Sequence, residues 1–225
     1  MDSVLRAYAR IGQRALLLTT AAVPLTGWAV HAAVLHRQLA AKSRDPLTGL
    51  LRRDAYTARA HRILRRHRHE TTVVLIDQDH LKTINDRHGH AAGDTALAET
   101  AARLTTWAGP HAAIGRLGGD EFALVLALPA KDRHERLQQL VTLLSTPVTL
   151  PGGWPINVGA SVGAAATDTL DTRDLSALQR AADAALYDGK HSGRAVLATP
   201  VHASTRSVNG RRAGRPGTHQ WGRAA

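Results

Sequence analysis

Two groups of acidic residues carry the strongest chemical signal in the sequence. The first, Asp77-Gln78-Asp79, directly follows the apolar run Thr71–Ile76, and the second, Asp120-Glu121, directly follows Gly118-Gly119. Acidic residues that follow a hydrophobic strand lie at its exposed end, where a carboxylate can reach a cation without being buried unpaired. Carboxylate oxygens suit Mg²⁺, which in turn holds nucleotide phosphates. Together the two groups predict an oxygen-lined magnesium site, in which the glycines let the backbone approach a ligand closely.

Each group alone also has a simpler structural explanation. An Asp at a strand end is usually a turn or helix-cap residue, and a Gly-Gly-Asp sequence is usually only a tight turn. Lys190 and Arg194 follow a predicted helix, where basic residues commonly complement the helix dipole. A site is indicated only by the combination of these residues with Asn85 and Asp94.

The candidate residues are distributed over alternating predicted strands and helices. The hydrophobic periodicity predicts helices over about residues 53–69, 91–107, 131–145 and 174–188, and strands over about 71–77, 111–116, 121–128, within 147–166 and near 194–198. Gly118-Gly119 predicts a β-hairpin, and the stretch from residue 78 to His90 is polar, with no regular element predicted. The order β-α-β-β-α-β predicts an α+β fold of the ferredoxin-like or palm type, a mostly antiparallel sheet flanked by helices.

The net charge of +11 lies in the two flanking segments. Residues 1–44 carry six Lys/Arg and one Asp, and residues 199–225 carry five Arg and no acidic residue, so that 45–198 is nearly neutral. This distribution argues against a specific nucleic-acid-binding face on the central domain. The chain has no cysteine, which excludes disulfides, thiolate metal sites and a cysteine nucleophile.

The flanking segments leave several alternatives open. No charged residue occurs from Ala15 to Leu35, and a spanning helix needs about 20 apolar residues, but Pro24 and Gly27 interrupt the run. A membrane span, a helix at a membrane surface, a cleaved signal peptide and a helix that pairs two chains are all compatible with it, with a cytoplasmic catalytic domain in each non-secreted case. Residues 28–43 are predicted to form a helix that ends before Asp45-Pro46, and residues 199–225 a disordered basic tail.

Five motifs in order make residues 45–198 resemble the GGDEF domain family of diguanylate cyclases. They are Asp45-Pro46-Leu47-Thr48-Gly49-Leu50, the stretch from Asp77 to Asp94, Gly118-Gly119-Asp120-Glu121-Phe122, Ser161-Val162-Gly163, and Ala184-Ala185-Leu186-Tyr187 leading to Lys190 and Arg194. A single Gly-Gly-Asp would be weak evidence, whereas five motifs in the same order are specific.

The resemblance implies a role for each matching residue. Asp77 and Asp120 match the metal carboxylates, and the main-chain carbonyl of Gln78 matches a further ligand. Glu121 matches an acid that helps to activate the attacking hydroxyl or binds a second metal ion.

The remaining matches concern the nucleotide. Asn85 and Asp94 match the guanine-binding pair, and a carboxylate can accept hydrogen bonds from N1–H and the exocyclic amine of guanine, which adenine does not offer together. Lys82, Lys190 and Arg194 match the phosphate contacts.

The resemblance implies that two GTP molecules are condensed into cyclic di-GMP and pyrophosphate, with Mg²⁺ or Mn²⁺ as cofactor. Each protomer of a homodimer would contribute one nucleotide, because each 3′-hydroxyl attacks the other α-phosphate. Two alternatives remain: an inactive GGDEF domain that binds GTP and regulates a partner, and an Arg-containing tail that binds nucleic acid or anionic membranes. Five arginines without interleaved aromatic residues favour a solvated tail over the second alternative.

The sequence departs from the family pattern in three places. The entrance motif commonly continues with Asn-Arg, whereas here Leu50-Leu51-Arg52-Arg53 follows, and the usual aromatic residue is missing near His80-Leu81. The Arg-x-x-Asp motif of feedback inhibition would fall at Gly109-Pro110-His111-Ala112 and is absent. We therefore predict that cyclic di-GMP does not inhibit the protein through that site, and potent noncompetitive inhibition in a product titration would contradict this.

Overall fold

The computed structural model describes residues 26, 28, 30–32, 34, 43–67, 69–190 and 192–204, and the chain divides into two units, Met1–Ser43 and Arg44–Ala225. The described residues between 26 and 34 are helical, with Trp28, Val30 and Val34 exposed. Most of the apolar run 15–35 and of the predicted helix 28–43 lies outside the described residues. Within the described part of the chain, no helix has the length and apolar character needed to cross a membrane.

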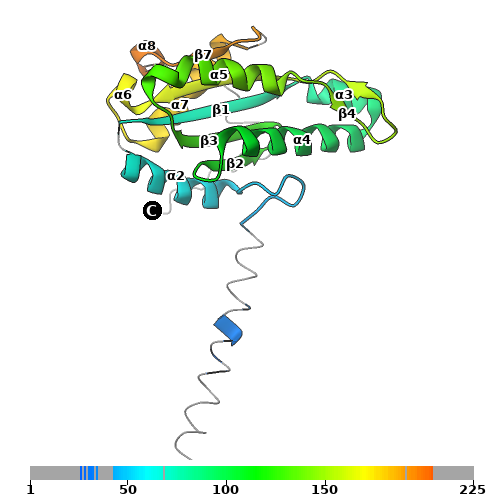
Figure 1. Cartoon of the computed structure of the whole chain (residues 1–225), viewed down its shortest axis with the longest axis horizontal. Coiled ribbons are helices and arrows are strands. Elements are labelled where there is room, and N and C mark those ends of the chain that lie inside the picture. Colours follow the sequence, from blue (N-terminus) through cyan, green and yellow to red (C-terminus); the bar gives the residue numbers. More distant parts are fainter. Residues whose placement is uncertain are drawn as a thin grey trace, which may run out of the picture. The chain divides into compact units, whose positions relative to one another are not determined.

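A five-stranded sheet forms the centre of the second unit (Figure 1). Its order is β2-β3-β1-β6-β7, with the strands β2 (Ala113–Gly118), β3 (Glu121–Ala127), β1 (Thr71–Asp79), β6 (Gly159–Ala166) and β7 (Ala195–Leu197). Neighbouring strands are antiparallel except for the parallel pair β6 and β7. The first four strands have the ferredoxin-like order, so the predicted α+β fold is confirmed.

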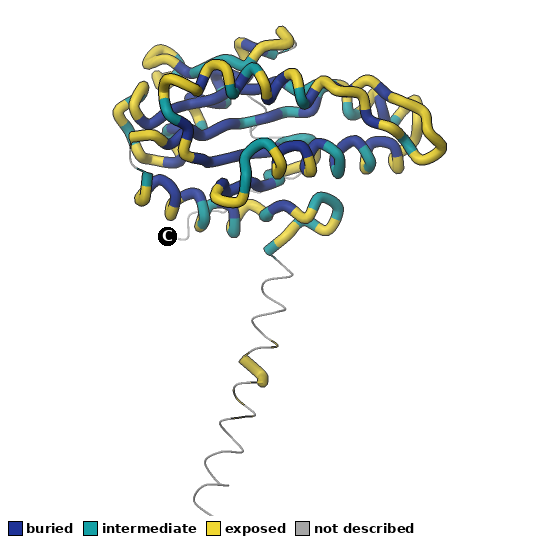
Figure 2. The backbone as a smooth tube through the Cα atoms, in the orientation of Figure 1, coloured by how far each residue is buried: buried dark blue, intermediate teal, exposed yellow. Residues whose placement is uncertain are grey.

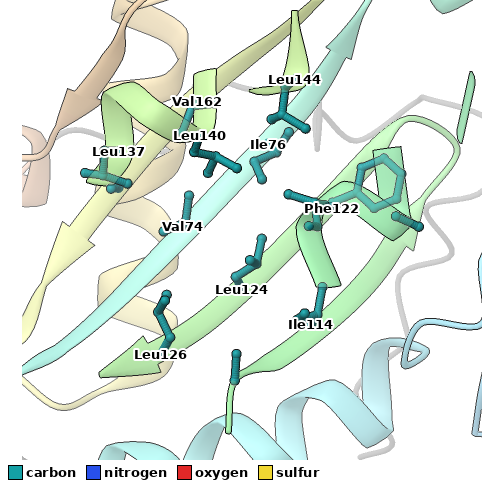
Figure 3. Packing of buried hydrophobic residues seen from close by; sticks show 14 of the residues in the cluster. Val74, Ile76, Ile114, Phe122, Leu124, Leu126, Leu137, Leu140, Leu144 and Val162 are labelled. Atoms are coloured by element: carbon teal, nitrogen blue, oxygen red, sulfur yellow. The ribbon is translucent and has the colours of Figure 1, made fainter. Parts of the chain in front are cut away.

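Helices cover both faces of the sheet. The helices α4 (His90–Ala108) and α5 (Ala130–Leu144) pack on one face, and α2 (Arg53–His67) and α7 (Leu175–Asp188) pack on the other. Alternate residues of β1 point to opposite faces: Val74 and Ile76 join the α4/α5 core shown in Figure 3, and Val73 joins the α2/α7 core. Figure 2 shows the resulting buried layer between exposed helix surfaces. Because both faces are covered, the central part of β1, Val73–Ile76, is continuously apolar and does not alternate.

The helix α7 approaches β6 very closely at Gly163. A Cβ atom at this position would overlap the main-chain oxygen of Ala182 and the main-chain nitrogen of Leu186, and helix backbone cannot move aside easily. Glycine therefore lets α7 lie directly on the strand, which fixes the height of the α7 residues above the end of β1.

The structure adds elements that the sequence patterns miss. The polar stretch after β1 contains the helix α3 (Leu81–His88), which begins after His80 in a left-handed conformation (φ 58°). Only Ile84 of α3 is buried, against a small cluster with Ala92 and Ala96 of α4, so its apolar periodicity is too short to be recognised. The short helix α6 (Thr167–Leu170) also goes beyond the prediction. The hairpin of β4 (Val148–Thr149) and β5 (Pro155–Ile156) lies, like β6, within residues 147–166, where strands are predicted.

The last described residues also differ from expectation. Pro200–Ser204 form the helix α8, where the sequence predicts a disordered tail from residue 199. The rest of that predicted tail, residues 205–225, lies outside the described residues.

Candidate active site

Strand register brings Asp77 and Glu121 together at one end of the sheet. Asp77 of β1 lies directly opposite Glu121 of β3 on one side and Ser161 of β6 on the other. Since directly opposed residues of antiparallel strands share a face, both carboxylates lie on the face covered by α7. The side chain of Asp77 is 16% exposed.

The Gly118-Gly119 turn places Asp120 next to the end of β1. The amide of Gln78 donates a hydrogen bond to the main-chain oxygen of Asp120 at 3.0 Å. Arg116 holds the turn from outside, because its Nε and Nη2 donate to the oxygen of Gly119 at 3.1 and 2.8 Å. The sequence-predicted acids Asp77, Asp120 and Glu121 are thus gathered at one end of the β1/β3 pair.

Lys190 reaches this group from the segment after α7. Its Nζ lies 3.3 Å from Asp77 Oδ1. Burial raises the pKa of Asp77; the Lys190 charge opposes this, while the charges of Asp120 and Asp79 raise the pKa further. A cation placed beside such a carboxyl group would stabilise its charged form.

A fourth acid, Asp183, reaches the same pocket from α7. Asp183 lines a small pocket together with Asp77, Glu121, Leu117 and Leu186. No sequence motif marks Asp183, which precedes the end of α7 by five residues.

Asn85 and Gly93 are in direct contact between α3 and α4. A Cβ atom on Gly93 would overlap Asn85 Oδ1, and this oxygen is buried with no hydrogen-bond partner among the described residues. Asp94, the next residue, is exposed. An acceptor without a partner beside an exposed carboxylate suits a ligand edge rich in N–H donors, as guanine has.

The sequence profile described as "Diguanylate cyclase, GGDEF domain" matches residues 42–196. The chain is 47% identical over 173 residues to the uncharacterised 19.3 kDa protein in the repSA 5′ region of Streptomyces ambofaciens, covering 76% of this chain and 91% of that protein. It is 36% identical over 156 residues to the diguanylate cyclase TpbB of Pseudomonas aeruginosa, covering 67% of this chain. The chain belongs to the GGDEF family of diguanylate cyclases. It spans 35% of the length of TpbB.

A solved structure supports the same family assignment for the fold. The GGDEF domain alone of PA1120, also named TpbB or YfiN, from Pseudomonas aeruginosa is 35% identical, with a TM-score of 0.64. The match covers 71% of this chain and 96% of that one. The GGDEF domain is therefore present here nearly in full.

Two predicted phosphate ligands of this GGDEF domain stand apart from the acids. Lys82, in the first turn of α3, and Arg194, just before β7, are both exposed. In the described part of the chain, no hydrogen bond or ion pair joins either side chain to Asp77, Asp120 or Glu121. Their assignment to phosphate groups stays a prediction.

Few protein groups of this GGDEF domain are placed where they could hold a metal ion. Among the described residues, no three His, Asp or Glu side chains are grouped closely enough to hold a metal ion. Asp77 and Asp120 offer two carboxylates. Burial and, to a smaller extent, the Asp120 charge raise the pKa of Asp77, and a divalent cation between the two carboxylates would offset both effects. This donor set fits Mg²⁺, which usually keeps waters and phosphate oxygens as further ligands.

The entrance motif supports the Gly118-Gly119 turn from a distance in sequence. Arg116 Nη1 lies 3.1 Å from Asp45 Oδ1, which also accepts hydrogen bonds from the amide and hydroxyl of Thr48 at 2.9 and 2.7 Å. Burial alone would raise the pKa of Asp45, but these hydrogen bonds and the Arg116 charge outweigh it and hold the pKa below its usual value. Sequence reasoning recognised Asp45 as part of a motif without finding this function.

Proposed function

We propose that the protein is an active diguanylate cyclase, which condenses two GTP molecules into cyclic di-GMP and pyrophosphate. The observation that carries this proposal is the position of the largely buried Asp77 carboxylate. It lies opposite Glu121, next to the turn that carries Asp120, and its Oδ1 is 3.3 Å from Lys190 Nζ. An inactive domain has no need to keep a buried carboxylate among like charges, because the arrangement costs folding free energy.

Asn85 and Asp94 would bind the guanine base. The unpartnered Oδ1 of Asn85 and the exposed carboxylate of Asp94 are both acceptors. Guanine offers N1–H and the exocyclic amine on one edge, whereas adenine has an acceptor at N1. A site built of acceptors therefore selects GTP over ATP.

Asp77, Asp120 and the main-chain carbonyl of Gln78 would hold Mg²⁺, with Mn²⁺ as a substitute. When bound, the ion neutralises phosphate charge and polarises the phosphoryl oxygens. Lys190 would then exchange its contact with Asp77 for a phosphate oxygen, since its side chain is 32% exposed and flexible enough to turn. Lys82 and Arg194 would contact further phosphate oxygens.

Glu121 is placed to handle the proton of the reaction. It lies directly across from Asp77 and lines the same pocket as Leu117 and Leu186. In the proposed reaction a 3′-hydroxyl oxygen attacks the α-phosphorus of the other GTP, pyrophosphate leaves, and the hydroxyl proton passes to an acceptor such as Glu121. Holding both nucleotides in line supplies much of the rate enhancement.

Two protomers are required because each contributes one nucleotide. We propose that residues 45–198 form the catalytic domain and that the N-terminal segment, residues 1–44, holds two chains together. Exposed apolar side chains at Trp28, Val30 and Val34 of that segment suit a helix that pairs with a second copy.

The test is incubation of the purified chain with GTP and Mg²⁺, followed by chromatographic detection of cyclic di-GMP. Product is expected from the wild type and is expected to disappear in Asp120→Ala. The matched control is Asp132→Ala, which removes an exposed carboxylate of α5 and should leave activity intact. Tight GTP binding without product in the wild type would support the alternative, a GTP-binding regulatory domain.

A further inference from the structure

The chain folds back onto α7 after the end of the family match at residue 196. The amide of Ala198 donates to the oxygen of Ala164 at 2.7 Å, which extends the β7 pairing with β6, and Ala198 is fully buried. Thr199 then begins the turn into α8, whose residues contact α7. A segment outside the family match is thus built into the domain (Figure 1).

His202 of α8 joins this segment to the end of α7. Its Nδ1 accepts the amide hydrogen of Thr199 at 3.0 Å, with the Thr199 hydroxyl 2.9 Å away. Since an amide can donate only to an unprotonated ring nitrogen, the proton of the neutral imidazole is on Nε2. Nε2 lies 3.1 Å from Asp188 Oδ2 and donates to it. The imidazole therefore bridges the start of α8 and the last residue of α7.

The bridged residue stands next to the backbone that carries Lys190. Gly189 is buried against β7, where a Cβ atom would lie 2.6 Å from Val196 Cγ2. The amides of Gly189 and Lys190 donate to the oxygens of Ala185 and Tyr187 at 3.0 and 3.2 Å. Asp188 to Lys190 is thereby held by β7 from one side and by His202 from another.

We propose that His202 is a positioning residue that fixes the end of α7 and, through it, the backbone of Lys190, so that the Lys190 ammonium group reaches the nucleotide site beside Asp77. The contact at 3.3 Å between Lys190 and Asp77 depends on where this end lies, because Lys190 is the second residue after α7. The inference deepens the proposed function, since it assumes that Lys190 serves the nucleotide site. It also gives residues 198–204 a role in substrate binding.

The first experiment compares His202→Ala with the wild type in the full chain. One hydrogen bond of this kind corresponds to roughly a three- to tenfold change in an equilibrium constant. We expect the KM for GTP, and the Kd for a non-hydrolysable GTP analogue, to rise by this factor while kcat changes less. In a Lys190→Met background, His202→Ala should have no further effect on analogue binding, because the group that it positions is absent.

Two further variants separate positioning from a general loss of stability. His202→Gln can still donate to Asp188 and should restore most of the affinity, whereas His134→Ala, at an exposed position of α5, should change nothing. Hydrogen exchange of the Gly189 and Lys190 amides should accelerate in His202→Ala and stay unchanged in His134→Ala.

The outcomes distinguish the two proposals. If the wild type makes no product, the proposed cyclase activity fails, while analogue binding and hydrogen exchange still test His202. Unchanged analogue affinity in His202→Ala, or an equal loss of affinity in the Lys190→Met background, would overturn the positioning role.

Discussion

Asp77 carries its carboxylate in a largely buried position beside two other acids. Burial and the charges of Asp120 and Asp79 raise its pKa, although Lys190 opposes the shift. The folded state therefore binds a proton at Asp77 more tightly than the unfolded chain does. The contribution of Asp77 to the free energy of unfolding therefore decreases as the pH rises above the ordinary aspartate pKa of about 3.9.

We predict that Asp77→Asn stabilises the protein while it abolishes cyclase activity. The amide keeps the shape of the side chain and removes the buried charge, so the melting temperature at neutral pH should rise by a few degrees. The gain should shrink as the pH is lowered toward 4, because the wild-type carboxyl then takes up its proton. Thermal melts in EDTA between about pH 4 and pH 8 check this. A variant less stable than the wild type at pH 8 would contradict it.

The absence of a side chain at Gly93 leaves room for Asn85, the proposed guanine-binding residue. We predict that Gly93→Ala raises the KM for GTP at least tenfold, because the new methyl group overlaps Asn85 Oδ1 and must displace that side chain. Calorimetric titration with a GTP analogue measures the loss directly. Ala102→Ser, which adds one atom at an exposed position of the same helix, is the control and should bind normally. Wild-type affinity in Gly93→Ala would show that the position of Asn85 does not matter for guanine binding.

At the scale of elements, Arg116 connects the entrance turn to the hairpin turn that carries Asp120. We predict that Arg116→Ala costs about 1.5–3 kcal/mol of unfolding free energy, since it removes charge-assisted hydrogen bonds to Asp45 and Gly119. It should also lower kcat, because the Gly118-Gly119 turn loses its outer support. Urea titration and the cyclase assay measure the two effects.

The pH dependence of stability gives a second measure of the contact between Arg116 and Asp45. The pKa of Asp45 is held below its usual value, so its stabilisation is complete above that value and is lost as the pH falls through the lowered folded pKa. Arg116→Ala should reduce this acid-side loss. The control is Arg59→Ala, which removes one hydrogen bond to the Pro110 oxygen and should cost less than 1 kcal/mol by the order of magnitude of a single exposed bond. Equal losses in both variants would count against a special role for Arg116.

At the scale of the whole molecule, catalysis by two protomers predicts a steep response to inactive subunits. Mixing wild type with an excess of Asp120→Ala should suppress activity more strongly than dilution by an inert protein, because mixed dimers contain only one complete half-site. Specific activity of the wild type alone should also rise with protein concentration until dimers are saturated. Activity that is simply proportional to wild-type concentration in both experiments would indicate that one chain suffices.

The sequence by itself determined the central elements and the acids at their ends. The positions of α2, α4, α5 and α7 and of β1 to β3 follow from hydrophobic periodicity, which is a local property of the chain. Asp77 and Asp120 could be paired in advance because a hairpin places its turn beside the end of the neighbouring strand. The helix α3 was missed because its single buried side chain, Ile84, gives no period.

Only the tertiary structure decided which distant residues meet. Arg116 and Asp45 are 71 residues apart, and Lys190 and Asp77 are 113 residues apart, so no local pattern encodes either contact. The packing of α7 on β6 at Gly163 brings Asp183 to the pocket with Asp77, and the packing of α8 on α7 brings His202 to Asp188. Such contacts depend on the register and height at which elements pack, and these are set by the whole core together.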